Sequence, residues 1–223
     1  LTASTDLIPA ETSGAAEALE DDFNPMLHPG GIHSYHFQPT GDHHLGGGDH
    51  ADYSHGDGSD DSAASWGAFI LPTVVNDNTI FAKYDSAGAK EEYRFHIDSS
   101  GDLALELHDA SASATEVATG GAVTLNQGAV VIATYDGAQA APAVHLYINA
   151  VDGNTAGSTT ETGSYVAMEN TATPITVGCA GVTATPTTEF SGRIALPFMT
   201  GKALTQAEVE QIGSIYKVLL GLP

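Results

Sequence analysis

The sequence predicts an all-β protein: an antiparallel two-sheet jelly-roll sandwich with one C-terminal helix and an extended N-terminal arm. Apolar and polar residues alternate with a period of two in several short stretches between residues 66 and 199, which is typical of strands with one buried face. The chain has 25 Gly and many Thr, Ser and Ala, a composition that suits numerous tight turns. No helical pattern separates successive stretches, so we expect about ten strands in antiparallel sheets.

A hairpin over residues 93–108 carries the clearest alternation. Three apolar residues from Tyr93 to Ile97 alternate with polar ones, and three leucines from Leu103 to Leu107 do the same after a turn at 99–102. Two such runs around a turn with glycine predict paired strands that bury one face. The other expected strands are 66–71, 79–84, 128–135, 143–151, 175–178 and 190–198.

One helix is expected at the C-terminus. Thr205 and Glu208 have the spacing of a capping box, in which the hydroxyl and the carboxylate each bond the other residue's backbone amide. Gly221 is placed to end the helix. We expect the apolar stripe of this helix to lie on a sheet face or against a neighbouring subunit. The stripe consists of Val209, Ile212, Ile215, Tyr216 and Leu219.

The chain divides into an arm, residues 1–30, and a jelly-roll domain, residues 31–223. The arm is acidic, contains no Lys or Arg and is poor in aromatic residues. Its first ten residues lack the basic start and apolar run of a signal peptide, so we expect no targeting segment there. A segment of this composition does not bury enough apolar surface to fold by itself, and we expect it to lie along neighbouring subunits. The alternative is a tail that lies on its own domain or on a crystal neighbour.

A histidine-rich zone follows the arm. Seven of the ten histidines lie between residues 28 and 55, where they alternate with aspartates and glycines. Of these seven, His43 with His44, or His50 together with Asp52, could bind zinc or nickel, but no spacing fixes a tetrahedral site, and we favour a polar loop that faces solvent or a neighbouring subunit. Because the first Lys is Lys83, these histidines could also change the local charge between pH 5 and 7. They are His28, His33, His36, His43, His44, His50 and His55.

The net charge excludes two classes of partner. Asp and Glu number 28 and Lys and Arg number 6, so the formal charge is −22. Nucleic acids and anionic membrane surfaces both require clustered Lys and Arg. The acid excess favours solubility in high salt or an anionic particle coat. We expect the few cations, Arg94 and Arg193 among them, to pair with carboxylates, and the single Cys179 to be a small buried residue.

The order of the strand motifs resembles the laminin G-like, concanavalin A-like jelly-roll family over residues 32–217. The resemblance begins with an acidic, glycine-rich loop and a strand that carries Trp66. The segment 165–171 is similar to versions in tailed-virus genomes. The chain departs from the family pattern at Ala150, where Gly usually follows Asn149, and at 195–199. The motifs are 54–69, 80–84, 93–95, 133–136, 146–149, 190–194 and 202–209.

A calcium site is expected in the loop before the first of these strands. Asp57, Asp60 and Asp61 supply hard oxygen ligands on a flexible loop, with Glu169 as a weaker fourth candidate. Laminin G-like domains often hold calcium near such loops. The spacing is not that of an EF-hand, and the same glycines also suit a plain turn. We expect no other cofactor.

The sequence favours a structural role over catalysis. The paired strand carboxylates of jelly-roll glycoside hydrolases and the Gly-x-Ser-x-Gly elbow of hydrolases are both missing, so we expect no enzyme activity. The resemblance implies a virion structural protein, an outer capsid decoration or cement protein on the capsid exterior, bound through its arm to the major capsid protein or other virion subunits as a homotrimer. The alternative is a lectin-like adhesion module of a tail fibre or receptor-binding protein that binds a host glycan.

Overall fold

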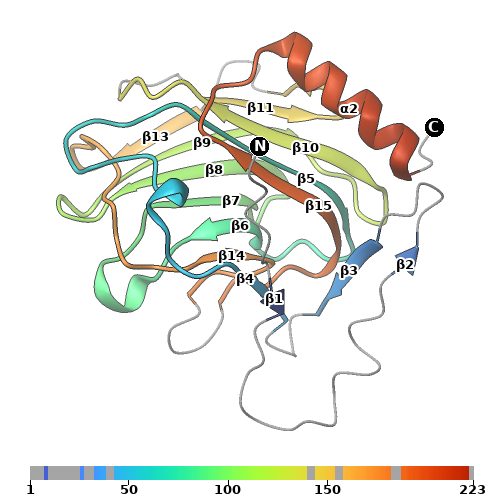
Figure 1. Ribbon diagram of the computed structural model, residues 1–223, viewed down its shortest axis with the longest axis horizontal. Helices are drawn as coiled ribbons and strands as arrows, with labels where there is room; N and C mark the ends of the chain where they lie inside the picture. Colours follow the sequence, from blue (N-terminus) through green and yellow to red (C-terminus); the bar gives the residue numbers. More distant parts are fainter. Residues whose placement is uncertain are drawn as a thin grey trace, which may run out of the picture.

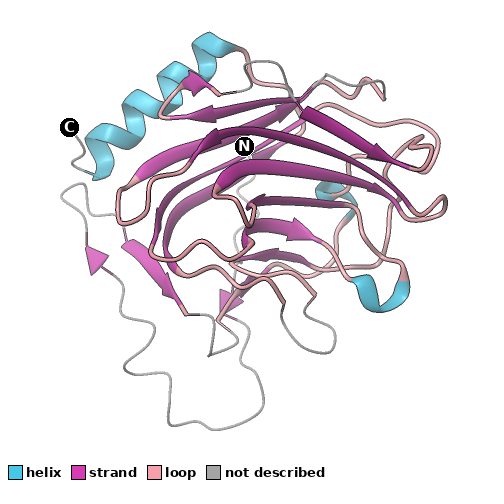
Figure 2. Cartoon of the chain, turned by 180° about the vertical axis from the view of Figure 1, so that it is seen from behind, coloured by secondary structure: helices cyan, strands magenta, loops and turns pink. Residues whose placement is uncertain are grey.

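The chain forms a two-sheet antiparallel sandwich with one C-terminal helix, as the sequence predicts (Figure 1). The computed structural model describes residues 8–9, 26–27, 33–38, 43–139, 144–153, 158–181 and 187–220. The two 3-10 helices lie at one end of the sandwich, and the C-terminal end of the long helix lies at the other (Figure 2). The described part of the chain contains no helix with the length and apolar character needed to cross a bilayer.

The first sheet has eight strands in the order β1-β4-β14-β6-β7-β8-β9-β13. Every pairing in it is antiparallel. The expected hairpin is its centre, with Arg94 opposite Glu106 in the register. The strands are β1 (Ile8–Pro9), β4 (Leu45–Gly46), β14 (Ile175–Val177), β6 (Asn78–Lys83), β7 (Tyr93–Ile97), β8 (Asp102–Asp109), β9 (Ala114–Ala122) and β13 (Ser158–Thr162).

The second sheet has seven strands in the order β12-β11-β10-β5-β15-β3-β2. The strands are β12 (Val151–Asp152), β11 (Val144–Ile148), β10 (Ala129–Tyr135), β5 (Ala64–Pro72), β15 (Gly192–Thr200), β3 (His33–Phe37) and β2 (Met26–Leu27). In the described ranges, the helices outside the sheets are η1 (Ala51–Tyr53), η2 (Ser86–Gly88) and α2 (Gln206–Leu220).

The main core lies between the two sheets. The inward residues of β7 and β8, which include Tyr93 and Leu105, meet the inward residues of β5 and β10, which include Trp66 and Tyr135. All four of these side chains are almost fully buried. Burial of such large apolar groups stabilises by roughly 25 cal/mol per Å² removed from water, so this layer supplies most of the driving force for folding.

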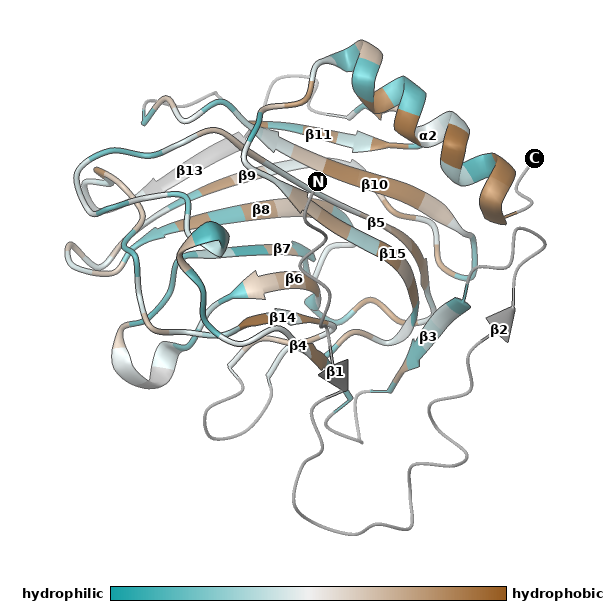
Figure 3. Ribbon diagram, in the orientation of Figure 1, coloured by the Kyte–Doolittle hydropathy of each residue, from teal (hydrophilic) through white to brown (hydrophobic). Residues whose placement is uncertain are grey.

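A second apolar cluster lies under α2, on the outer face of the seven-stranded sheet. Val130 and Ile132 point into this cluster, while Val131 and Ala133 of the same strand point into the main core. This two-sided burial explains why β10 is a continuous apolar run, which Figure 3 shows as a largely brown ribbon. The helix contributes Val209, Tyr216 and Leu220.

The capping box of α2 forms as predicted. Thr205 N donates to Glu208 Oε2 at 2.9 Å, and Glu208 N donates to Thr205 Oγ1 at 3.4 Å. The expected stripe is wrong at Ile215, which is 50% exposed, because Gly213 and Leu220 take the inward positions. Gly221 lies outside the described residues.

Among the described strands of five or more residues, three were not predicted from the sequence: β3, β9 and β13. β9 and β13 are rich in small residues and Thr, so their alternation has little hydrophobic contrast. β3 lies inside the histidine-rich zone and pairs with β15. The side-chain pattern does not reveal these strands, because they form through backbone hydrogen bonds to a neighbouring strand and have few large apolar residues.

Two short segments of the predicted arm add to the edges of the sheets. Ile8–Pro9 pairs with β4, and Met26–Leu27 pairs with β3. At these two points the arm lies against its own domain. The remaining residues of the arm lie outside the described residues, so its predicted path along neighbouring subunits stays a prediction.

Candidate functional site

The outer face of the eight-stranded sheet is strongly polar at its centre. Because Tyr93 and Phe95 of β7 point into the core, their neighbours Arg94 and His96 point outward. Glu106 and His108 of β8 share that outer face. Figure 3 shows teal bands on β7 and β8, whereas α2, the one α-helix in the described ranges, covers the outer face of the other sheet.

Arg94 is the centre of this polar cluster. Its Nε and Nη2 donate to Glu106 Oε2 and Oε1, both at 3.0 Å, and its Nη1 donates to Asp77 Oδ2 at 3.0 Å. Such a two-pronged contact is the strongest that a guanidinium makes with a carboxylate. The expected pairing of Arg94 with carboxylates is confirmed.

Two histidines extend the cluster along the sheet. The ring of His96 lies 2.8 Å from Asp77 Oδ1 through Nδ1 and 3.5 Å from Glu106 Oε1 through Nε2. The ring of His108 bridges Glu106 Oε2 at 3.3 Å and Thr115 Oγ1 at 3.2 Å. With Thr115, six side chains therefore form one connected, largely buried polar network that runs from the turn before β6 across β7 and β8 to β9.

The charges of this cluster stabilise one another. Burial acts to raise the pKa of Glu106, but hydrogen bonds from His108 and Arg94 and the charge of Arg94 hold that pKa far below its ordinary value. Burial also acts to raise the pKa of Asp77, and His96 and Arg94 lower it. For Arg94, burial acts to lower the pKa, and the two carboxylates raise it. Both carboxylates therefore stay ionised near neutral pH.

A pocket of about 310 Å³ adjoins the cluster. The ring of Tyr84 lies 5.8 Å from the Arg94 guanidinium and 5.1 Å from the His108 ring, so this tyrosine links the pocket to the cluster. Hydroxyl and carboxylate groups dominate the rest of its wall. The lining residues are Tyr84, Ser86, Ala89, Glu91, His108, Asp109, Ala110, Ser113, Ala114 and Thr115.

Sequence reasoning missed Asp77 and Tyr84 as members of this site. The run Asn76-Asp77-Asn78 between two expected strands marks a turn, and Asp77 adopts a positive φ of 56° there. That local signal shows a tight turn, but it does not show that the carboxylate reaches across to Arg94.

Two of the three aspartates proposed for calcium, Asp57 and Asp61, use their carboxylates for other contacts in the structure, and Asp60 contributes its backbone N–H to one of them. Asp57 Oδ1 accepts from Ser59 N and Asp60 N, which makes a local turn. Asp61 accepts from Tyr135 and Tyr165 through Oδ2 and from Met168 N through Oδ1. Burial raises the pKa of Asp61, and these hydrogen bonds act against the rise.

Both carboxylate oxygens of Asp61 therefore accept hydrogen bonds from protein groups, and the Asp57 carboxylate accepts hydrogen bonds from the backbone of its own loop. Across the described ranges, no three His, Cys, Asp or Glu side chains gather closely enough to hold a metal ion. The calcium site stays a prediction, and the function proposed below does not depend on it.

The histidine-rich zone does not behave as one unit. His33 and His50 are exposed, His44 is buried, and His28 lies outside the described residues. His55 is 4% exposed, and its ring lies edge-on to Trp66 at 5.4 Å. Burial lowers the pKa of His55 to about 4, so this residue does not change charge between pH 5 and 7.

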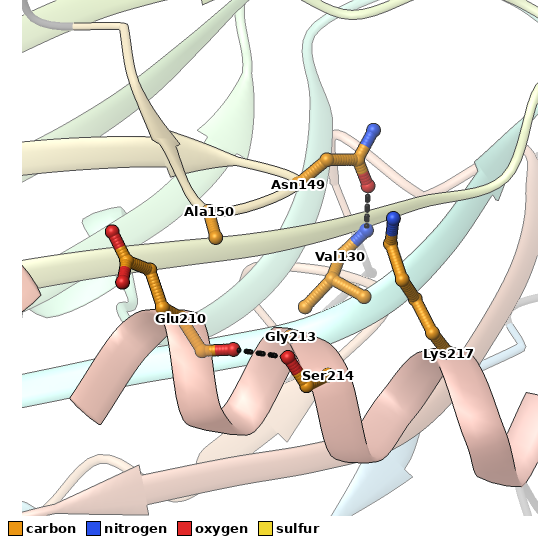
Figure 4. Close-up of a pocket in the computed structure, with 7 residues that line it drawn as sticks. All are labelled: Val130, Asn149, Ala150, Glu210, Gly213, Ser214 and Lys217. Carbon is orange, nitrogen blue, oxygen red and sulfur yellow. Dashed lines mark hydrogen bonds between the residues drawn. The ribbon is translucent and has the colours of Figure 1, made fainter. Parts of the chain in front are cut away.

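A smaller pocket of about 170 Å³ lies between α2 and the turn that joins β11 and β12. Figure 4 shows Asn149 Oδ1 accepting from Val130 N, with Ala150 facing the helix between Glu210 and Lys217. The helix approaches at Gly213, where a Cβ would lie 3.4 Å from the Ala150 Cβ. This pocket has half the volume of the first and lies on the face that α2 covers.

Comparison with protein families finds one match. The model described as the concanavalin A-like lectin/glucanases superfamily matches residues 45–210. The matched segment includes β4 to β15 and the first turn of α2. No curated protein matches the chain in sequence.

Three solved structures illustrate the fold. The heptameric SAP-like pentraxin from Limulus polyphemus has a TM-score of 0.50 and 15% identity, over 76% of this chain and 81% of that one. The CBM40 of the Ruminococcus gnavus IT-sialidase, bound to α2,3 sialyllactose, has a TM-score of 0.55 and 13% identity, over 70% and 84%. The botulinum neurotoxin serotype G binding domain has a TM-score of 0.58 and 11% identity, over 89% and 48%. At these identities the likeness shows a shared fold.

Proposed function

Since the chain belongs to the concanavalin A-like lectin/glucanase superfamily, we propose that it is a non-catalytic, lectin-like module that binds a glycan on the outer face of its eight-stranded sheet. The observation that carries this proposal is the asymmetry of the two faces. The outer face of the seven-stranded sheet is closed by α2, whereas the other carries the Arg94 cluster and the pocket of about 310 Å³ beside it.

The pocket has the chemistry that a sugar requires. The ring of Tyr84 offers a flat apolar surface for the C–H groups of a pyranose, and Ser86, Ser113 and Thr115 offer hydroxyls for its oxygens. Salt bridges and hydrogen bonds already hold Arg94 and His108 in place. A preorganised surface loses less side-chain entropy when a ligand binds.

The charge of the pocket favours a neutral or basic glycan. Glu91 and Asp109 lie in its wall, and none of the described residues that line it is Lys or Arg. The nearest guanidinium, Arg94, is already neutralised by two carboxylates. A carboxylated sugar would meet repulsion from this wall and from a chain of net charge −22. We therefore expect neutral or amino sugars to bind more tightly than sialylated ones.

The same geometry argues for binding without hydrolysis. A glycoside hydrolase needs one carboxyl group that carries a proton near neutral pH. The low pKa of Glu106 and the lowered pKa of Asp77 keep both groups ionised, so neither can serve as the acid. The proposed role of these two side chains is to hold Arg94 and the histidines in place.

A glycan array followed by calorimetry tests the proposal. We expect binding to neutral or amino sugars, with a loss of at least tenfold in affinity for Tyr84→Ala, because the stacking surface is removed. Gln211→Ala, on the exposed side of α2, is the matched control and should bind as the parent does. Binding that is unchanged in Tyr84→Ala, or no binding to any glycan, would contradict the proposal.

The virion role is a separate proposal about where this module works. It is supported by the net charge of −22 and by the resemblance of residues 165–171 to tailed-virus versions of the domain. In it, a homotrimer sits on the capsid exterior, with each arm along a neighbouring subunit; a tail-fibre or receptor-binding location would use the same glycan site. Deletion of residues 1–30 should then release the domain from particles and leave it folded. A truncated domain that stays on the particle would contradict this arrangement.

A further inference from the structure

A second polar cluster lies inside the sandwich, at the end of β6. Lys83 is the last residue of that strand and is fully buried. Its Nζ lies 2.6 Å from Glu92 Oε1 and 3.1 Å from Asp49 Oδ1, and it donates to Thr171 O at 2.6 Å. An amine, a nearby carboxyl group and a second carboxylate thus meet in a site closed to water around the nitrogen.

Hydrogen bonds hold the Glu92 carboxylate in place beside Lys83. It is fully buried, and its Oε1 accepts from Thr171 N at 2.6 Å and from Thr171 Oγ1 at 2.8 Å as well as from Lys83. Its Oε2 is buried and has no hydrogen-bond partner among the described residues. Burial raises the pKa of Glu92, and the hydrogen bond and charge of Lys83 act against that rise.

Asp49 differs from Glu92 in its surroundings. Its side chain is 41% exposed, and it follows three consecutive glycines, of which Gly48 has a φ of +70° and open space around it. Glycine backbone adopts more conformations than that of other residues, so this loop can adjust to bring the Asp49 carboxyl carbon to the Lys83 nitrogen, from which its Oδ1 is 3.1 Å away. A water molecule released at Asp49 has a direct path to solvent.

We propose that Lys83 and Asp49 condense to an intramolecular isopeptide bond, with Glu92 relaying the protons. The Lys83 Nζ gives one proton to Glu92 and attacks the Asp49 Cγ, so that an N–C bond forms. One C–O bond of Asp49 then breaks, and that oxygen leaves as water with the two protons that the nitrogen has lost. Glu92 returns to its starting state, and an ammonium and a carboxylate become a neutral amide and water, so no oxidant or co-reactant is needed.

Two physical effects favour this condensation inside the protein. Fixed groups at contact distance react with effective concentrations far above those of separate molecules in water. A buried ammonium and its carboxylates also carry a large desolvation cost, and the amide removes two of these charges. The bond would join the loop after β4 to the end of β6. It would restrict the conformations open to the unfolded chain, as a disulfide does, and so stabilise the folded state.

The mass of the full chain under denaturing conditions tests the proposal. We expect the chain to be lighter than its sequence by one water molecule. Trypsin should fail to cut at Lys83, so residues 1–90 should remain on one peptide that carries the deficit. Lys83→Arg and Asp49→Ala should each have the full mass that their sequences predict. Glu92→Gln should also have its full mass, and we expect this variant to fold.

A control is needed because succinimide formation at Asp-Gly sequences causes the same mass loss. The chain has such sequences at 57–58, 136–137 and 152–153. Mild alkali hydrolyses a succinimide and leaves an amide intact, so the proposed deficit should survive that treatment. A wild-type chain with the full mass, normal tryptic cleavage at Lys83, or a deficit that persists in Asp49→Ala would overturn the proposal. The tryptic map uses the wild-type chain, so it remains decisive if a variant does not fold.

Discussion

Arg94 and Glu106 lie directly opposite each other in the β7–β8 hairpin and meet through two parallel hydrogen bonds of 3.0 Å. The alternation that sends Tyr93 and Leu105 into the core sends these two residues to the outer face. The pair therefore joins the two central strands of the proposed binding surface. Asp77 completes it from the turn before β6.

Glu106→Gln should destabilise the protein by about 2–3 kcal/mol, because it leaves the Arg94 charge with one carboxylate in place of two. The pKa of Glu106 is lowered in the folded state from an ordinary value of 4.5. Its contribution is therefore present above that value and is lost as the pH falls through the folded pKa. Urea unfolding at pH 7 and pH 3 should show a smaller difference between variant and parent at pH 3.

Glu210→Gln is the control for this change, since Glu210 lies exposed on α2. Its effect should stay within about 0.5 kcal/mol at both pH values. A Glu106→Gln variant as stable as the parent at pH 7 would show that the pair contributes nothing measurable.

His55 should make the protein less stable in acid. Its pKa is lowered by burial from 6.5 to about 4 in the folded state, so the unfolded chain binds the proton more readily. Stability is then lost as the pH falls below 6.5, by about 2 kcal/mol at pH 5. Between pH 7 and pH 5, the free energy of unfolding of His55→Phe, measured with urea, should fall by about 2 kcal/mol less than that of the parent. His145→Asn, at an exposed site, is the control and should lose as much stability as the parent does. Parallel pH profiles for His55→Phe and the parent would contradict this.

Ala150→Gly should stabilise the protein by about 0.5–1 kcal/mol. Asn149 and Ala150 are the two central residues of the turn between β11 and β12, with φ values of 53° and 66°. A tight hairpin turn of this kind favours Asn followed by Gly, because a Cβ is unfavourable at the second position. The midpoint of urea unfolding should rise with an unchanged slope. A lower midpoint would mean that the packing of the Ala150 methyl against α2 outweighs the backbone strain.

Calcium should raise the melting temperature if the loop of Asp57, Asp60 and Asp61 binds it, because a ligand specific to the folded state stabilises that state. At about ten times its Kd the gain is about 1.4 kcal/mol. Removal with a chelator should reverse the shift, and Asp60→Asn should abolish it. A melting temperature that is the same with calcium and with chelator would contradict the predicted site.

The sequence pattern predicted the structure correctly where residues close together in the chain determine it. The hairpin of β7 and β8 was predicted from alternation around a turn, and the start of α2 from the capping pair Thr205 and Glu208. Both depend on bonds between residues close in sequence. The resemblance in motif order extended this to the whole sandwich, and the match to residues 45–210 confirms it.

The candidate site could be predicted only in part. Arg94 was expected to find carboxylates, but Asp77 lies 17 residues away and reaches it only through the pairing of β6 with β7. Ile215 fits a helical stripe yet is exposed, because the sheet surface beneath α2 decides which residues lie inward.

By itself, the sequence determined the strands with strong alternation, the helix start, the acidic charge and the class of fold. Tertiary structure alone decided that His55 is buried and titrates near pH 4, that Asp61 is bound by two tyrosines, and that Lys83, Glu92 and Asp49 meet. The physical reason is that periodicity and capping act over a few residues. Burial and charge pairing depend on which distant segments the register of two sheets brings together.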